Sequence, residues 1–369
     1  MSTAVRSEAP VEELEVGAYT IPTDQPEADG TLAWDATTLV VVHVRGGGEC
    51  GLGYTYADVS TAKLVESKLA GVVAGRDAMA PQAAWEAMVE QTRNLGRPGI
   101  TSMAIAAVDL ALWDLKARVL GLPLCKLLGM AHERVPVYGS GGFTAYSPQR
   151  LAEQLASWVE QGIPRVKMKV GSAPAEDPER VMLARGAIGP DAELFVDANG
   201  AYSRKQALEL AERFRHEARV SWFEEPVSSE DLEGLRLLRD RAPAGMAIAA
   251  GEYGDDAPYF RRMIEAGAVD VLQADVTRCG GITELLRVGA LCRAYNLPLS
   301  LHCGPAIHLH PATALEQFVH LENFHDHVRI EQMLFDGAVS PEDGFLVPDL
   351  DRPGNGLEFK RSEAERHAA

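Results

Sequence analysis

Six short apolar runs, each closed by an ionisable residue, recur along the second half of this 369-residue chain. Successive end residues stand 28, 27, 28, 23 and 27 positions apart. They are Lys169, Asp197, Glu224, Glu252, Asp275 and His302. A step of this length holds one strand, one helix and two loops. Such repeats predict a parallel βα barrel whose end residues share one rim and point toward one another.

The rest of the chain suggests a second, smaller domain. Residues 13–130 begin with β-branched segments and continue with helical periodicity, which is typical of an α+β domain. From Val135 strands and helices alternate, and no GxGxxG motif supports an open dinucleotide-binding sheet. We expect an α+β capping domain over residues 1–132, completed by 337–369, and a barrel over 133–336. The polar segment from Ile21 to Trp34 is expected to be a long loop over the site.

Charge and cysteine content exclude several classes of partner. The net charge of −18 disfavours nucleic acid and membrane surfaces as partners. The five cysteines are scattered and form no CxxC pair, so reduced thiols in a cytoplasmic protein are expected, with no Cys/His dyad suggested. No signal peptide is visible, and Asp109 and Asp114 interrupt the longest apolar stretch, which therefore cannot span a bilayer.

Three of the end residues are carboxylates on neighbouring strands. Asp197, Glu224 and Glu252 cannot all stay ionised at close quarters unless a cation lies between them. Oxygen ligands alone favour Mg²⁺ first and Mn²⁺ second. Any one of these acids could instead cap a helix at a strand–helix loop. Three in register favour the metal site.

Two lysines share one face of the strand before this trio. Lys167 and Lys169 are two positions apart, so both point into the barrel mouth. Mutual repulsion and a nearby metal would lower a lysine pKa, which suits a general base. A solvated edge strand with alternating lysines is the alternative.

Asp275 and His302 end consecutive strands and are expected to touch. A carboxylate on one imidazole nitrogen fixes the tautomer and raises the basicity of the other nitrogen. A purely structural histidine is the alternative. Glu322 near the eighth strand is either a loop acid or, if protonated, a donor to an oxyanion. Other histidines are expected to be surface or packing residues: His308, His310, His320, His325 and His327.

Together these residues suit proton abstraction next to a carboxylate. A bound Mg²⁺ would chelate the substrate carboxylate and acidify the α-proton. A lysine on one face and a histidine on the other could each take or return that proton. Return of the proton from the other face gives racemisation, whereas loss of a β-hydroxyl from the enediolate gives dehydration.

The motifs VKMKVG, VDANG, WFEEP, GE, QAD and LH resemble those of the enolase superfamily, within its mandelate racemase subgroup. The segment SMAIAAVDLALWDLKARVLGLPLCKLLG is similar to the family helix that joins cap to barrel, so the resemblance covers almost the whole chain. It implies a modified TIM barrel, (β/α)₇β, with an α+β cap. It also implies Mg²⁺ on Asp197, Glu224 and Glu252, and a symmetric homo-oligomer.

The resemblance further implies roles for the proton-transfer residues. Lys169 would be the base for one configuration, and the His302–Asp275 dyad would act on the other face. Lys167 would lie near the substrate carboxylate, and Glu322 would hydrogen-bond the enediolate. Substrate contacts are expected from Tyr54, Ser140 and Asn199.

We expect a dehydratase that converts an aldonate or aldarate into a 2-keto-3-deoxy acid. Polar residues of the expected loop suit a hydroxylated small-molecule carboxylate: Thr23, Asp24, Gln25, Glu27 and Asp29. A racemase or epimerase of a 2-hydroxy acid is the alternative, and a catalytically silent metal-binding protein is the third. Tyr253 stands where relatives often have Asn, so the details of substrate contact differ from theirs.

Overall fold

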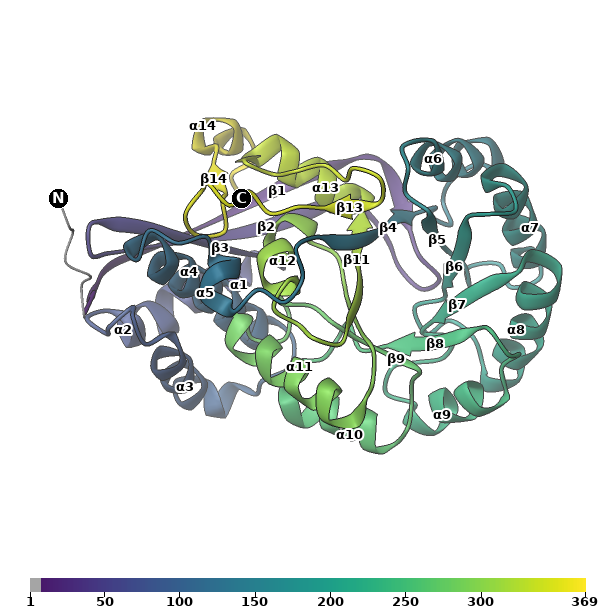
Figure 1. Cartoon of the computed structure of the whole chain (residues 1–369), viewed down its shortest axis with the longest axis horizontal. Coiled ribbons are helices and arrows are strands. Elements are labelled where there is room, and N and C mark those ends of the chain that lie inside the picture. Colours follow the sequence, from purple (N-terminus) through teal and green to yellow (C-terminus); the bar gives the residue numbers. More distant parts are fainter. Residues whose placement is uncertain (1–7) are drawn as a thin grey trace.

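The computed structural model describes residues 8–369, and a closed parallel barrel forms its centre (Figure 1). Consecutive strands are neighbours, and β11 pairs with β4 to close the sheet, as predicted. The barrel strands are β4 (Val135–Gly141), β5 (Arg165–Lys169), β6 (Glu193–Asp197), β7 (Val220–Glu224), β8 (Ala247–Ala250), β9 (Val271–Ala274), β10 (Leu299–Leu301) and β11 (Phe318–Phe324).

Helices form the outer ring of the barrel. They are α6 (Pro148–Glu160), α7 (Asp177–Ile188), α8 (Arg204–Ala218), α9 (Leu232–Arg241), α10 (Ala257–Glu265), α11 (Ile282–Tyr295), α12 (Pro305–Ala312) and α13 (His325–Leu334). Side chains at the N-cap position stabilise the first turn of several of these helices. Ser203 and Gln206 form a capping box at α8, and the Asp256 side chain accepts from the Tyr259 amide at α10.

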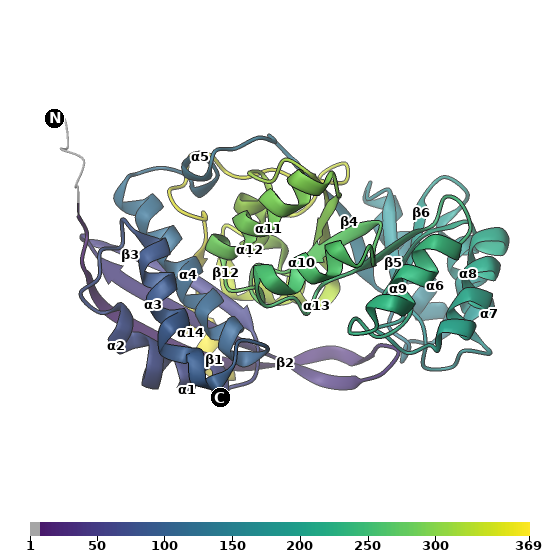
Figure 2. The same cartoon turned by 90° about the horizontal axis from the view of Figure 1, so that it is seen from below.

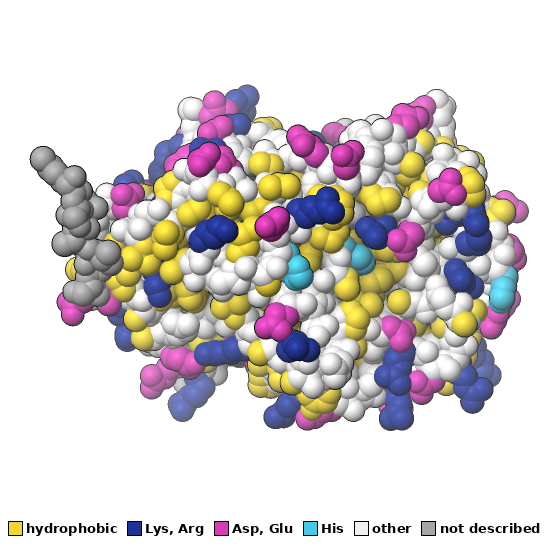
Figure 3. All heavy atoms as spheres, in the orientation of Figure 1, with side chains coloured by type: hydrophobic (Ala, Val, Ile, Leu, Met, Phe, Trp, Pro, Cys, Tyr) yellow, Lys and Arg dark blue, Asp and Glu magenta, His cyan; other side chains and the backbone are white. Residues whose placement is uncertain are grey.

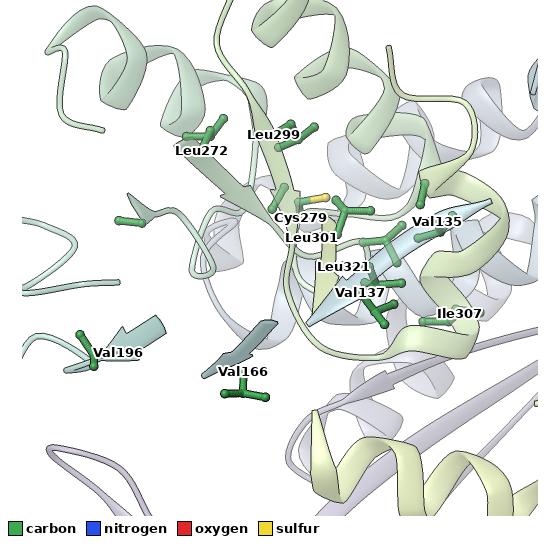
Figure 4. Packing of buried hydrophobic residues seen from close by; sticks show 14 of the residues in the cluster. Val135, Val137, Val166, Val196, Leu272, Cys279, Leu299, Leu301, Ile307 and Leu321 are labelled. Atoms are coloured by element: carbon green, nitrogen blue, oxygen red, sulfur yellow. The ribbon is translucent and has the colours of Figure 1, made fainter. Parts of the chain in front are cut away.

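Side-chain alternation divides each barrel strand into two faces. Outward side chains such as Val166 and Leu272 belong to the apolar layer between strands and helices (Figure 4). Inward, Phe195 and Trp222 stack at 5.3 Å, and His320 meets Trp222 at 5.1 Å. Because successive inward residues are two positions apart, the next ones along these strands are the ionisable residues. The aromatic layer is therefore the floor of the site.

The N-terminal part forms an antiparallel sheet covered by helices. Its strands are β1 (Val11–Ala28), β2 (Ala33–Gly46) and β3 (Glu49–Tyr56). The helical segments are α1 (Ser60–Leu64), η1 (Val65–Leu69), α2 (Ala70–Val73), α3 (Pro81–Thr92), η2 (Arg93–Leu95), α4 (Ile100–Val119) and α5 (Leu124–Leu128). Helix α4 packs directly on β3 because Gly53 has no side chain. A Cβ there would lie 2.2 Å from the Ala107 carbonyl oxygen.

The C-terminal segment returns from the barrel to this sheet. It holds β12 (Phe335–Asp336), β13 (Phe345–Leu346), β14 (Glu358–Phe359), α14 (Arg361–Ala364) and η3 (Glu365–His367). The rings of Phe359 and Tyr19 lie 5.3 Å apart, and the Ala369 amide donates to the Ala18 carbonyl. Along residues 8–369, no helix combines the length and apolar character needed to cross a membrane.

The expected loop from Ile21 to Trp34 is wrong, because β1 and β2 continue through it as a hairpin. Figure 2 shows this long hairpin reaching from the cap to the barrel. The two prolines of this segment, Pro22 and Pro26, lie within or beside a register shift between Pro22 and Glu27, where ladder hydrogen bonds are not required. Trp34 Nε1 then donates to Glu27 Oε2 at 2.8 Å across the restored pairing.

Candidate active site

Three buried carboxylates meet at the carboxyl ends of neighbouring strands. Asp197 and Glu224 end β6 and β7 and pair in register, and Glu252 lies just beyond β8. One carboxylate oxygen from each lies within 4.8 Å of the others. Glu252 Oε2 is buried without a hydrogen-bond partner. An oxygen-only donor set with an unpaired anionic atom fits a hard divalent cation such as Mg²⁺.

Both lysines of β5 point into this group, as their spacing predicts. Lys169 Nζ lies 2.5 Å from Asp197 Oδ2, and Lys167 Nζ lies 2.5 Å from Glu224 Oε1. Burial favours neutral amines, but the carboxylates outweigh it, so the pKa values of Lys167 and Lys169 are both raised. The lowered lysine pKa expected beside a bound metal stays a prediction; among the protein groups alone, attraction to the carboxylates exceeds lysine–lysine repulsion.

The histidine and aspartate after β10 and β9 form a hydrogen-bonded pair. His302 Nδ1 lies 2.8 Å from Asp275 Oδ2, and the amide and hydroxyl of Thr277 both donate to Asp275 Oδ1. Burial would raise the pKa of Asp275, but the His302 bond and nearby positive charge lower it. A neutral His302 that donates from Nδ1 to Asp275 has its lone pair on Nε2, which lies 3.3 Å from Glu252 Oε2.

Glu322 is held in the same layer from β11. Its Oε1 accepts from Ser140 Oγ at 2.5 Å and lies 2.8 Å from Lys167 Nζ. Burial favours the protonated acid, but Lys167 lowers the pKa of Glu322 well below its ordinary value. The expected protonated donor is thus an ionised carboxylate here, because the neighbouring ammonium stabilises the charge.

A cavity of about 520 Å³ lies between the barrel mouth and the cap, and of these groups Lys169, Glu252 and His302 line it. Of the expected contacts, Asn199 lines it and Ser140 lies behind Glu322. Tyr54 does not line it, because its ring is fully buried and its hydroxyl donates to Glu331 Oε1 at 2.6 Å. Tyr56, two residues further along β3, lines the cavity instead.

Two further cavity residues escaped the sequence reasoning. Arg278 Nη1 lies 3.2 Å from Glu252 Oε1, and its Nε lies 3.6 Å from Asp275 Oδ2. Its position three residues after Asp275, in a βα loop, is the signal that could have found it. His327, expected to be a packing residue, stacks on Tyr56 with ring centroids 3.5 Å apart and lines the cavity.

Cys303 corrects the expectation of no Cys/His dyad. Its Sγ lies 3.1 Å from His302 Nε2, and it lines the same cavity. Its φ of +51° is left-handed, as are those of Asn199 at +45° and Glu225 at +38°. Each follows the end of a barrel strand. Such conformations cost about 1–3 kcal/mol each and concentrate at functional sites.

Comparisons with known proteins agree with this fold and site. Residues 150–364 match the family model described as enolase C-terminal domain-like. Residues 20–129 match the N-terminal domain of mandelate racemase and muconate lactonizing enzyme. The chain therefore belongs to the enolase superfamily, in the mandelate racemase and muconate lactonizing enzyme subgroup.

Curated relatives act on acid sugars. The 3,6-anhydro-alpha-L-galactonate cycloisomerase of Streptomyces coelicolor is 32% identical, covering 95% of this chain and 98% of its own. The L-talarate/galactarate dehydratase of Salmonella typhimurium is 30% identical, covering 90% of this chain and 82% of its own.

Solved structures share the whole fold. A mandelate racemase/muconate lactonizing enzyme-like protein from Rubrobacter xylanophilus superposes with a TM-score of 0.96 at 62% identity, over 98% of this chain and 100% of that one. A racemase from Streptomyces coelicolor A3(2) with bound magnesium superposes with a TM-score of 0.91 at 30% identity. The match covers 97% of this chain and 100% of that one.

Proposed function

We propose that this protein is a Mg²⁺-dependent dehydratase that converts an aldonate or aldarate into a 2-keto-3-deoxy acid. The observation that carries the proposal is a buried carboxylate trio whose member Glu252 lines one cavity together with Lys169 and His302. Solved relatives with bound magnesium support Mg²⁺ as the ion, and Mn²⁺ would be an acceptable substitute. Relatives named as acid-sugar dehydratases support the reaction.

The proposed mechanism assigns one step to each group. Asp197, Glu224 and Glu252 would hold Mg²⁺, which supplies Lewis-acid stabilisation of negative charge on the substrate carboxylate. Lys169 and His302 come from opposite parts of the barrel, and both line the cavity. One takes the α-proton, and the other can give a proton to the leaving β-hydroxyl. Asp275 keeps the His302 lone pair on Nε2.

Lys167 and Glu322 would position the substrate. Lys167 Nζ lies 2.8 Å from Glu322 Oε1 and 3.4 Å from Asp197 Oδ2, so its ammonium lies between the trio and β11. There it can pair with a substrate carboxylate. In the expected family role, Glu322 hydrogen-bonds the enediolate. Because the acid is ionised here, that role requires it to gain a proton in the complex.

The cavity lining supports a hydroxylated substrate. Of the polar hairpin residues expected to contact it, only Asp29 lines the cavity, whereas Glu27 is fully buried against Trp34. Other hydrogen-bonding groups take their place: Thr37, Thr38, Asp58, Asn199 and Arg278. Such groups suit a sugar acid better than an aromatic acid.

A racemase or epimerase is the second candidate, because proton-transfer groups from opposite parts of the barrel also suit inversion at the α-carbon. The test is a panel of aldonates, aldarates and 2-hydroxy acids, with Mg²⁺ or with EDTA. A dehydratase gives a semicarbazide-reactive 2-keto acid lighter by one water. A racemase gives only α-proton exchange in D₂O. Absence of both would indicate the silent metal-binding protein.

We also propose a cytoplasmic homo-oligomer that binds neither nucleic acid nor membranes. The net charge of −18 supports the absence of nucleic-acid and membrane partners, and the five free thiols support the cytoplasm. On the face drawn in Figure 3, acidic and basic side chains are interspersed and form no large basic patch. Light scattering would give the mass in solution, and a monomer would contradict the oligomer.

A further inference from the structure

Three side chains beside the carboxylate trio place a nitrogen, a sulfur and an oxygen close together. Cys303 Sγ lies 3.1 Å from His302 Nε2 and 3.4 Å from Glu322 Oε2. The distance from His302 Nε2 to Glu322 Oε2 is 3.8 Å. In a tetrahedral Zn²⁺ site with these ligand types, the donor atoms are roughly 3.4–3.6 Å apart. The triangle matches that spacing to within about half an ångström.

The groups behind the triangle already orient its donor atoms. Asp275 binds His302 Nδ1 at 2.8 Å, which leaves the Nε2 lone pair facing the sulfur. Ser140 and Lys167 hold Glu322 Oε1 at 2.5 and 2.8 Å, which leaves Oε2 facing the same point. Carboxylate–histidine pairs of this kind are regular outer partners of zinc ligands.

We propose that His302, Cys303 and Glu322 form a second metal site that takes Zn²⁺ or Co²⁺ in preference to Mg²⁺. A sulfur and an imidazole nitrogen select borderline ions, whereas Mg²⁺ prefers oxygen ligands alone. On binding, the thiol gives its proton to solvent, and the thiolate and carboxylate together balance the divalent charge. The fourth coordination position opens to the cavity, which both His302 and Cys303 line.

Occupancy of this site would inhibit the enzyme. The ion takes the His302 Nε2 lone pair, which the proposed reaction needs to accept a proton. It also takes Glu322 Oε2, which otherwise accepts from the amide and the thiol of Cys303. Inhibition therefore rests on the proposed function, whereas metal binding does not and can be measured without turnover.

The binding test uses the full chain saturated with Mg²⁺. Zinc is measured by equilibrium dialysis, and Co²⁺ serves as a spectroscopic probe of thiolate ligation. The wild-type protein should retain one Zn²⁺ and show a sulfur-to-cobalt charge-transfer band. Cys303→Ser should weaken Zn²⁺ binding by at least about tenfold, since even loss of an outer partner costs about that much. The band should disappear, and Cys50→Ser, a matched thiol removal in β3, should change neither result.

Two outcomes would overturn the proposal. One is Zn²⁺ binding of unchanged affinity in Cys303→Ser. The other is complete displacement of Zn²⁺ by Mg²⁺ in the wild type, together with loss of Zn²⁺ binding in Asp197→Asn, which would place zinc in the carboxylate trio. In an activity assay, Zn²⁺ should inhibit the wild type much more strongly than Cys303→Ser. Zinc binding in a protein without turnover on any acid would contradict the proposed function alone.

Discussion

Buried carboxyl groups at this site differ in pKa because their neighbours differ. Burial and Asp197 raise the pKa of Glu224, whereas in Glu322 and Asp275 the effect of burial is reversed by Lys167 and by His302. Carboxyl groups of the same chemistry thus have pKa values shifted in opposite directions by their neighbours. The protonation of each carboxyl group therefore depends on the charged groups within a few ångströms of it.

The proton-transfer roles predict two inactive variants. Lys169→Ala and His302→Asn should each lower kcat by about 10²–10⁴-fold, because each removes a positioned acid or base. Circular dichroism and Mg²⁺ titration should show an unchanged fold and a functional metal site. His216→Asn and Lys205→Ala, exposed changes on α8, are the matched controls. Full activity in Lys169→Ala or His302→Asn would contradict the proton-transfer role of that residue.

Trp222 should tune the metal site through one hydrogen bond. Its Nε1 donates to Glu224 Oε2 at 2.9 Å from two residues earlier on β7. Trp222→Phe keeps an aromatic ring but removes the donor, so Mg²⁺ affinity measured by calorimetry should fall about 10–100-fold. Trp113→Phe removes a comparable bond to Thr283, away from the site, and should leave Mg²⁺ affinity unchanged. Equal affinities in both variants would contradict this role.

At the scale of elements, the β1–β2 hairpin carries the cap onto the barrel. Its turn is closed by Asp29 Oδ1, which accepts from the amides of Thr31 and Leu32. Asp29 and Leu32 line the cavity. Gly30 packs against the barrel rim, where a Cβ would lie 2.5 Å from the Ala198 carbonyl oxygen and 2.6 Å from that of Val170. The glycine lets the hairpin reach the ends of β5 and β6.

Gly30→Val should displace this hairpin. The branched side chain would meet backbone atoms that cannot move aside, so kcat/KM should fall by roughly 10²-fold as the cavity wall shifts. Mg²⁺ affinity should be unchanged, because the trio belongs to the barrel. Gly186→Ala on α7, where a Cβ meets no atom within 4 Å, is the control and should retain activity. Wild-type kinetics in Gly30→Val would show that the hairpin does not shape the site.

At the scale of the molecule, buried polar groups join the cap to the barrel. Tyr54 of β3 donates to Glu331 Oε1 of α13, and the Ala306 amide of α12 donates to Glu331 Oε2. Asp109 of α4 likewise accepts from the Thr283 amide and hydroxyl of α11. Such contacts hold the cap over the barrel mouth, and their protonation couples this junction to pH.

Glu331 should make the protein less stable as pH rises. Burial raises its pKa from 4.5 to about 8. Between these values the folded state holds a proton that the unfolded state lacks. The free energy of unfolding therefore falls by up to about 1.4 kcal/mol for each pH unit. In urea unfolding, Glu331→Gln should gain stability relative to wild type between pH 5 and pH 8. Parallel pH dependences would contradict this.

The sequence by itself determined the barrel and the residues at its mouth. Regular steps between strand ends and two-residue alternation are local properties, and together they place Lys169, Asp197, Glu224 and His302 on one rim. Only the tertiary structure decided that residues 21–34 extend a hairpin, that Tyr56 and not Tyr54 faces the cavity, and that Glu322 is ionised. Each of these depends on groups brought together from distant parts of the chain, and no local pattern encodes such packing.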